Sequence, residues 1–177
     1  PLAFVGFIDD LKNLKISIRF FVQVITVILI IYESQFIHDF GELEKFFILI
    51  LFILLLIIGT TIINLINFMD GIDGLVAGSM VLIFALGSIV ISNSFLIFVG
   101  SLLAFLLWNW YPSKVFMGDG GSTFLGALFF GLLLDSSNLI ELSKILILSS
   151  PLLIDSFLCI FRRFLNKQKI FDSHCSH

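Results

Sequence analysis

The stretch FFILILFILLLIIGTTIINLINFMDGIDGL, residues 46–75, decides the fold. Its first part, residues 46–63, is a continuous apolar run without a charged side chain. Such a run is nearly long enough to cross the ~30 Å hydrocarbon layer of a bilayer as an α-helix. Its second part, residues 64–75, places amides, acids and glycines directly after that run. The stretch therefore predicts a membrane-spanning helix that ends in a polar cluster.

The composition of the whole chain agrees with a membrane protein. Of its 177 residues 59% are hydrophobic, whereas soluble domains are about 45–50% apolar; the mean hydropathy is +1.13. The apolar runs are long and continuous, unlike the short alternating segments of a transmembrane β-barrel. We expect helices, because a helix satisfies its backbone hydrogen bonds internally within hydrocarbon. The basic residues are too few and too scattered to bind nucleic acid.

Several further apolar runs are long enough, or nearly so, to cross the membrane. All six runs together cover residues 17–32, 46–63, 75–91, 95–111, 121–134 and 139–160. We expect an all-α, polytopic integral membrane bundle of about six transmembrane helices, forming a single membrane-embedded domain over residues 1–177. The chain begins at Pro1 without a signal peptide, and we interpret it as a fragment truncated at both ends.

Lysines and arginines indicate how this bundle is oriented. Six crossings place on one side of the membrane the polar stretches 1–15, 64–74, 112–120 and 161–177. Eight basic residues lie on or beside this side: Lys12, Lys15, Arg19, Lys114, Arg162, Arg163, Lys167 and Lys169. Only Lys45 and Lys144 lie beside the other side. Since basic side chains accumulate on the cytoplasmic side, we expect the first side to be cytoplasmic.

Polar residues recur at steps of three after the apolar run 46–63. They are Asn64, Asn67, Asp70 and Asp73. On an α-helix, successive members of such a series drift by only about 60°, so the first three would form one polar stripe. Gly71 and Gly74 permit a tight turn and a close approach to a ligand. A solvated helix end would explain one or two polar residues, and we therefore interpret this series as a binding site.

A second signature, Met117-Gly118-Asp119-Gly120-Gly121-Ser122, precedes the fifth apolar run. A glycine-rich turn into a helix N-terminus exposes backbone N–H groups. The Asp119 carboxylate suits Mg²⁺, which usually takes one or two carboxylates together with substrate phosphates. We expect the helix to begin near Ser122, with the Ser122 hydroxyl as its cap.

Two weaker signatures lie on the same side. Asp9 and Asp10 are adjacent, and neighbouring carboxylates repel unless a cation lies beside them. In the tail, His174 and His177 offer imidazole N–H groups to a phosphate oxygen or a uridine-type head group. Carboxylates are costly near hydrocarbon, about 2.5–3.5 kcal/mol each at a helix centre. Their collection on one side indicates a charged ligand, such as a metal ion with phosphates.

Taken together, these signatures resemble one family, the polyprenyl-phosphate N-acetylhexosamine-1-phosphate transferases. In order along essentially the whole chain they read Gly-Phe-Ile-Asp-Asp, Asn-x-x-Asn-x-x-Asp-Gly-Ile-Asp-Gly-Leu, Phe-Met-Gly-Asp-x-Gly-Ser and His-x-Ser-His. The family includes the bacterial undecaprenyl-phosphate GlcNAc-1-phosphate transferase and the muramoyl-pentapeptide phosphotransferase of peptidoglycan synthesis. The resemblance implies a larger protein of about ten or eleven spans.

The resemblance also implies an activity, cofactor and partners. A Mg²⁺-dependent enzyme, with Mn²⁺ as the alternative ion, would transfer a sugar 1-phosphate from a UDP-N-acetyl amino sugar to undecaprenyl or another polyprenyl phosphate, releasing UMP. It would act at the cytoplasmic face of the bacterial inner membrane, in the first membrane step of cell-wall or O-antigen polysaccharide synthesis. Its partners would be the two substrates and the bilayer but no nucleic acid, and a homodimer is left open.

By the same resemblance each signature receives a role. The metal ligands would be Asp119, Asn67 and Asp70. The substrate-binding residues would be Asn64, Asn67, Asp73, Gly118 and His174, with Asp73 nearer the nucleotide. The catalytic residues would be Asp9, Asp10, Asp70 and His177, with Asp9 and Asp10 meeting the lipid phosphate. That phosphate is mostly dianionic at neutral pH if its second pKa is near ~6, so we expect direct in-line attack, with a covalent aspartyl-phosphate as the alternative.

Two other hypotheses are an ion-coupled membrane transporter and a non-catalytic remnant of the transferase. An intramembrane acid such as Asp155 is typical of ion pathways. The other acids, however, lie at one face instead of the midplane, and no inverted repeat is evident. These observations favour the enzyme.

Overall fold

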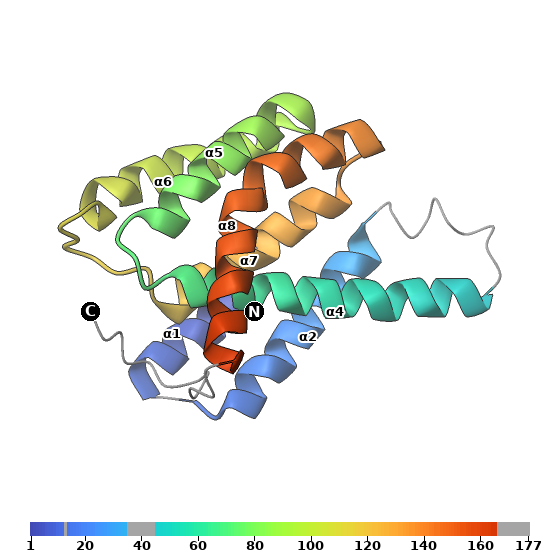
Figure 1. The fold of residues 1–177 in the computed structure, drawn as a ribbon, viewed down its shortest axis with the longest axis horizontal. Helices are drawn as coiled ribbons and strands as arrows, with labels where there is room; N and C mark the ends of the chain where they lie inside the picture. Colours follow the sequence, from blue (N-terminus) through green and yellow to red (C-terminus); the bar gives the residue numbers. More distant parts are fainter. Residues whose placement is uncertain (13, 35–44, 166–177) are drawn as a thin grey trace.

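The structure, a computed structural model, describes residues 1–12, 14–34 and 45–165. In this part of the chain all regular structure is helical, which confirms the predicted all-α bundle (Figure 1). The elements in order are α1 (Leu2–Lys12), α2 (Ile16–Glu33), α4 (Lys45–Met69), α5 (Leu75–Val90), the 3₁₀ turn η1 (Asn93–Phe95), α6 (Leu96–Asn109), α7 (Gly118–Leu134) and α8 (Leu139–Leu165).

Among the described residues, three helical segments are long and apolar enough to cross a membrane: Ile16–Glu33, Lys45–Met69 and Leu139–Arg162. The segments Leu75–Val90, Asn93–Asn109 and Gly118–Leu134 are apolar but shorter. They coincide with the remaining three of the predicted spans. Large apolar side chains such as Ile89 and Leu107 are more than four-fifths exposed on the outside. That arrangement is expected where helices face lipid, because lipid tails are themselves apolar.

The fold differs from the sequence prediction at two helix starts. Residues 1–15 were expected to be a polar stretch, but α1 runs through Leu2–Lys12, so Asp9 and Asp10 lie in its last turn. Helix α7 begins at Gly118 instead of near Ser122, which places Asp119 in its first turn. Both acids of α1 and the acid of α7 are therefore held on rigid helical backbone and not on loops.

Glycines let the central helix α7 lie very close to its neighbours. A Cβ atom added to Gly6 of α1 would lie 2.2 Å from Cα of Gly120 in α7, and one added to Gly126 would lie 2.8 Å from Cα of Ile63 in α4. Small residues allow such backbone approach between membrane helices. Helix α7 packs on α1, α2, α4 and α5, and its side chains Phe129, Phe130 and Leu132 are buried.

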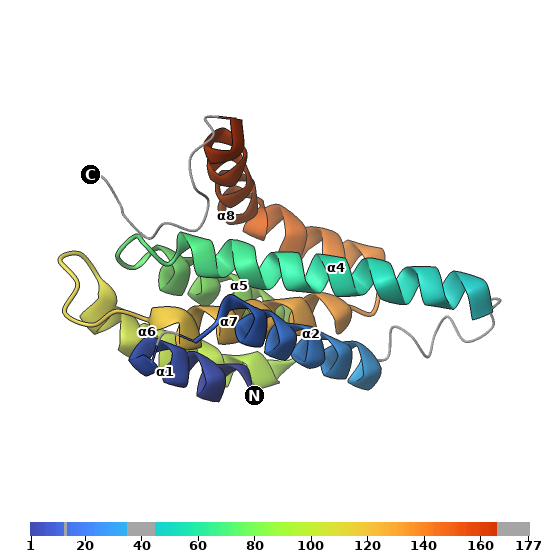
Figure 2. The same ribbon diagram turned by 90° about the horizontal axis from the view of Figure 1, so that it is seen from below.

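The turns gather at two opposite ends of the bundle. The connection from α1 to α2, the turn from α4 to α5 and the loop from α6 to α7 lie at one end in both views (Figures 1 and 2). The connections from α5 to α6 and from α7 to α8 lie at the other end. This is the alternation that the predicted crossings require. Helix α8 contains Pro151 and its second half turns away from the bundle (Figure 2), because proline removes a helical hydrogen bond and bends a helix.

Candidate functional site

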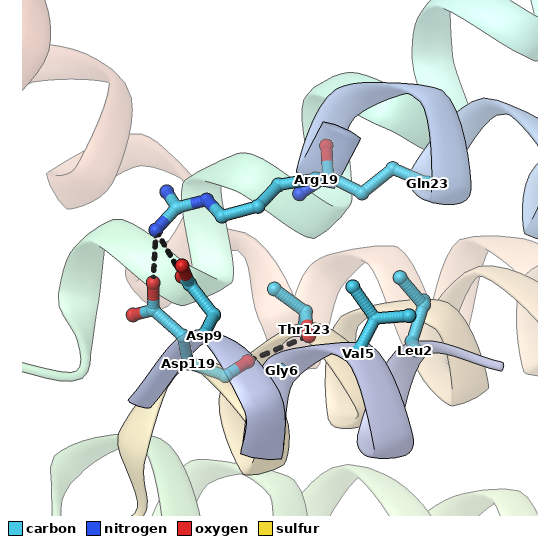
Figure 3. Close-up of a pocket in the computed structure, with 8 residues that line it drawn as sticks. All are labelled: Leu2, Val5, Gly6, Asp9, Arg19, Gln23, Asp119 and Thr123. Carbon is cyan, nitrogen blue, oxygen red and sulfur yellow. Dashed lines mark hydrogen bonds and ion pairs between the residues drawn. The ribbon is translucent and has the colours of Figure 1, made fainter. Parts of the chain in front are cut away.

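One arginine joins the acids of α1 and α7. Nη1 of Arg19, in the first turns of α2, donates hydrogen bonds to Oδ2 of Asp9 and to Oδ2 of Asp119, each at 2.5 Å (Figure 3). Asp9 is only 5% exposed and also accepts a hydrogen bond from the backbone N–H of Leu14 at 2.6 Å. Burial alone would raise the pKa of Asp9, but the hydrogen bonds from Arg19 and Leu14 and the positive charge of Arg19 together hold it below its usual range.

A small cavity lies beside this ion pair, with a volume of about 20 Å³, enough for roughly one water molecule. Its lining residues are Leu2, Val5, Gly6, Asp9, Arg19, Gln23, Asp119 and Thr123. Figure 3 shows the hydroxyl of Thr123 donating to the backbone carbonyl of Asp119, a contact of 2.6 Å. The backbone of Asp119 is thus held from within α7 while its carboxylate faces Arg19.

The polar stripe at the end of α4 reaches the same carboxylate. Nδ2 of Asn67 donates to Oδ1 of Asp119 at 3.1 Å and to the hydroxyl of Ser122 at 2.9 Å. Ser122 is buried, and its hydroxyl donates back to the carbonyl of Gly118 at 3.0 Å. Its side chain is therefore not the predicted N-cap: Met117 occupies that position without a side-chain cap. Ser122 serves instead to orient Asn67 within the site.

Asp10 holds the start of α7. Its Oδ1 accepts a hydrogen bond from the backbone N–H of Asp119 at 3.1 Å. Gly118 has a φ of +68°, and a Cβ atom there would lie 2.6 Å from Oδ2 of Asp10. The turn at Gly118 therefore needs glycine both for its left-handed backbone and for the approach of the Asp10 carboxylate.

Asp70 lies just beyond the end of α4 and is half-buried. Burial, together with the negative charges of Asp119 and Asp10, raises the pKa of Asp70 from its ordinary value of 3.8 to about 7. Asp70 therefore lies near enough to Asp119 and Asp10 for their charges to affect it. The structure thus brings together Asp9, Asp10, Asn67, Asp70, Gly118 and Asp119 at one end of the bundle.

Two predicted substrate-binding residues have other partners. Both carboxylate oxygens of Asp73 accept hydrogen bonds from Ser113, one from its N–H at 3.0 Å and one from its hydroxyl at 2.7 Å. The side chain of Asn64 pairs with Gln23, donating to Oε1 at 3.0 Å. Asp73 therefore connects the α4–α5 turn to the α6–α7 loop, and Asn64 reaches the cavity only through Gln23. The predicted His174 and His177 lie outside the described residues.

Arg19 and Gln23 belong to the site although none of the four sequence signatures contains them. By its position in the sequence Arg19 indicates only orientation. The sequence does contain a signal for these two residues. Arg19 and Gln23 lie four residues apart in a largely apolar run, and this spacing places the cation and the amide on one face of a helix.

The oxygen donors of the cluster suit a hard divalent cation. Oδ2 of Asp9 and Oδ2 of Asp119 each lie 2.5 Å from the same atom, Nη1 of Arg19, so the two oxygens are close to each other. The positive guanidinium group of Arg19 lies between them. Within the described residues no three His, Cys, Asp or Glu side chains converge as a ready set of metal ligands. Mg²⁺ usually takes only one or two carboxylates from the protein and completes its shell with water and substrate phosphates.

Comparison with known proteins places this cluster in a family. Residues 1–137, which include the whole cluster, match the family described as glycosyl transferase family 4. A probable undecaprenyl-phosphate N-acetylglucosaminyl 1-phosphate transferase of Bacillus subtilis is 33% identical over 97% of this chain and 52% of its own length. A phospho-N-acetylmuramoyl-pentapeptide-transferase of Wolbachia pipientis wMel is 34% identical over 71% of this chain and 46% of its own length.

A further phospho-N-acetylmuramoyl-pentapeptide-transferase, from Thermotoga petrophila, is 33% identical over 70% of this chain and 46% of its own length. The chain spans about half the length of these curated relatives. Both the extent of the family match and the near-complete coverage by the Bacillus subtilis relative lead to one conclusion: the chain belongs to glycosyl transferase family 4.

Proposed function

We propose that this chain forms part of a membrane enzyme that transfers an N-acetylhexosamine 1-phosphate from a UDP-sugar to undecaprenyl or another polyprenyl phosphate and releases UMP. The names of the relatives, an undecaprenyl-phosphate N-acetylglucosaminyl 1-phosphate transferase and phospho-N-acetylmuramoyl-pentapeptide-transferases, support a reaction of this class. The observation that carries the proposal is the contact of Asp119 with both Arg19 and Asn67 at the end of the bundle where the acids gather.

An acidic cluster alone would repel both substrates, because a lipid phosphate and a nucleotide diphosphate are anions. The proposal therefore includes Mg²⁺, or Mn²⁺ in its place. In a change from the predicted ligand set of Asp119, Asn67 and Asp70, we propose that Asp119 and Asp9, which share Arg19, would hold the ion, with Asn67 and Asp70 beside it. When bound, the ion would offset the negative charge of phosphate oxygens as they approach each other. Asn67 keeps the Asp119 carboxylate oriented, since its amide donates to Oδ1.

The reaction we propose is a direct in-line displacement. An oxygen of the lipid phosphate forms a bond to the sugar-bearing phosphorus of the UDP-sugar, while the bond from that phosphorus to the bridging oxygen breaks and UMP leaves with the bonding electrons. Asp10, which is exposed while Asp9 is buried, is the better placed of the two to position the lipid phosphate. Asp70 would lie beside the ion, whose positive charge would favour the ionised form of its carboxylate.

The position of the cluster supports a reaction at the membrane surface. The acids lie at the ends of the apolar helices α4 and α7, where a phosphate attached to a lipid would lie at the depth of the head groups. The end of α1, the start of α2 and the α6–α7 loop lie at the same end of the bundle, and these segments carry Lys12, Lys15 and Lys114. Basic residues accumulate on the cytoplasmic side. We therefore propose that the active site faces the cytoplasm from a bacterial inner membrane.

The transporter hypothesis has less support. Asp155, the acid that suggested it, is exposed on α8 and does not face the interior of the bundle. The acids of the cluster lie together at one end of the bundle. They do not form a path through it.

The test is transfer by membranes that contain the full-length protein. Labelled UDP-N-acetyl amino sugars and undecaprenyl phosphate are supplied with Mg²⁺ or with a chelator, and the labelled lipid product is extracted. We expect product only with the divalent ion, and loss of product in Asp119→Asn without loss of membrane insertion. Transfer that persists in the chelator, or in Asp119→Asn, would contradict the proposed metal site.

A further inference from the structure

Arg19 occupies the place between the two carboxylates that the proposed metal ion would need. Its Nη1 is equally close, 2.5 Å, to Oδ2 of Asp9 and to Oδ2 of Asp119. A positive nitrogen at that point and a divalent ion bound to the same two oxygens would repel each other at short range. Binding of the ion to these two oxygens would therefore oppose the contacts that Arg19 makes with them.

We propose that Arg19 is a displaceable counter-ion: it holds Asp9 and Asp119 together in the metal-free site, competes with the divalent cation for them, and on metal loading turns to the substrate phosphates. This inference rests on the proposed function, because it takes the metal site and the anionic substrates from it. It adds a positioning role for a residue that belongs to none of the four sequence signatures.

The side chain has the freedom that displacement requires. The Arg19 side chain is 36% exposed, and its long stem can carry the charged group toward water while the stem stays on apolar surface. A guanidinium carries five N–H donors. Within the described part of the chain only Nη1 is engaged, so Nε and Nη2 have no protein partner there. These free donors form an edge that matches the two oxygens of a phosphate.

The negative charges around the site require a positive partner when no metal ion is bound. Arg19 contacts Asp9 and Asp119, and Asp70 lies within the influence of the negative charges of Asp119 and Asp10. Without Arg19, the buried Asp9 would lack a compensating charge, which is strongly unfavourable. Arg19 therefore keeps α1 and α7 in register until the metal ion and its phosphates arrive.

Competition is reciprocal, so removal of Arg19 must strengthen metal binding. The experiment titrates Mn²⁺ into the full-length protein in detergent micelles and follows the free ion by electron paramagnetic resonance. Arg19→Gln is compared with Arg162→Gln, which removes the same charge from an exposed arginine on α8 that has no ion pair among the described residues. We expect Arg19→Gln to bind Mn²⁺ about tenfold more tightly, within the usual range for coupled binding, and Arg162→Gln to match the wild type. Equal or weaker binding by Arg19→Gln would overturn the inference.

A second readout separates this role from simple structural support. At saturating metal, loss of the phosphate contact should raise KM for the UDP-sugar in Arg19→Gln although its metal affinity has increased. Damage to the fold would weaken the binding of Mn²⁺ as well as the binding of the UDP-sugar. That result would also overturn the inference. If Arg19→Gln does not fold, Arg19→Lys replaces it, and Mn²⁺ binding weaker than in the wild type would count against competition.

An additional variant distinguishes failure of the inference from failure of the proposed function. Asp119→Asn should bind Mn²⁺ more weakly than the wild type. If it does so while Arg19→Gln leaves the affinity unchanged, the metal site stands and only the competition is refuted. If Asp119→Asn binds as tightly as the wild type, the proposed metal site is wrong and the inference falls with it.

Discussion

Nδ2 of Asn67 lies 3.1 Å from Oδ1 of Asp119, although the two residues are 52 positions apart in the chain. The contact joins the last turn of α4 to the first turn of α7. It connects the asparagine–aspartate series to the glycine-rich signature. No local sequence pattern relates these two motifs to each other. The amide has its donor directed at the carboxylate that we propose as the principal metal ligand, and the consequences of this orientation can be measured.

The first prediction concerns the Asn67 amide. Asn67→Leu keeps the approximate volume of the side chain but removes the hydrogen bonds to Asp119 and Ser122. Since partners that orient a metal ligand typically contribute 10–100-fold to activity, we expect kcat/KM for sugar-1-phosphate transfer to fall by about 10–100-fold. The matched control is Asn93→Leu, at an exposed asparagine in η1 at the opposite end of the bundle. A variant Asn67→Leu as active as that control would refute the orienting role.

A second prediction tests the backbone contact of α1 with α7. A Cβ atom on Gly6 would lie 2.2 Å from Cα of Gly120, and because that neighbour is backbone, the helices must separate. We expect Gly6→Ala to lower the free energy of unfolding by about 1–3 kcal/mol, the usual range for overpacking. Transfer should decline as well, because α1 carries Asp9 and Asp10. Thermal unfolding in detergent and transfer measured on the same preparation check both effects.

The control for that substitution is Gly100→Ala in α6, where an added Cβ atom would meet no atom within 4 Å. An alanine in a helix interior is about 1 kcal/mol more favourable than a glycine. Gly100→Ala should therefore be neutral or slightly stabilising. Equal effects of the two substitutions would show that the α1–α7 contact is looser than the structure has it.

A third prediction follows from the raised pKa of Asp70. In the folded protein the pKa is about 7, against an ordinary value of 3.8, so between these values the folded state binds more protons than the unfolded state. The contribution of Asp70 to stability therefore falls as pH rises through this window and stays unfavourable above it. Asparagine resembles the protonated acid and lacks this dependence.

The measurement compares metal-free wild type with Asp70→Asn across pH. We expect similar melting temperatures at about pH 4 and a higher melting temperature for Asp70→Asn at about pH 8, since only the wild type then carries the extra negative charge. Groups that do not interact with Asp70 titrate equally in both proteins and cancel in the difference. A difference that does not change with pH would mean that Asp70 ionises normally in the folded state.

The sequence was sufficient for the fold class and for much of the cluster. Long apolar runs allow few structures other than helices in lipid, and the acids at their ends were predicted to share one side. The structure brings Asp9, Asp10, Asp70 and Asp119 together at one end of the bundle. The chemical roles of these residues stay predictions.

Other parts of the site depend on tertiary packing and could not be inferred from local patterns. The close approach of Gly6 to Gly120 pairs helices far apart in the chain, and α1, which it packs on α7, continues to Lys12 where a polar stretch was predicted. The role of Arg19 depends on that same packing, because the arginine meets Asp119 across 100 residues of sequence. Spacing alone likewise did not indicate that Asp73 faces Ser113.

The last prediction concerns this Asp73–Ser113 contact. Asp73 was expected to lie near the nucleotide, and its two hydrogen bonds from Ser113 show that it also fastens the α4–α5 turn to the α6–α7 loop. If Asp73 affects the nucleotide only by holding that loop, Asp73→Ala and Ser113→Ala should raise KM for the UDP-sugar in the same direction. The double variant should then be little worse than Asp73→Ala alone, because residues in one network are not additive. Ser113→Ala should also lower the free energy of unfolding by about 1 kcal/mol. Additive increases of KM in the double variant would instead mean that Asp73 contacts the nucleotide directly, since its effect would then persist without its partner.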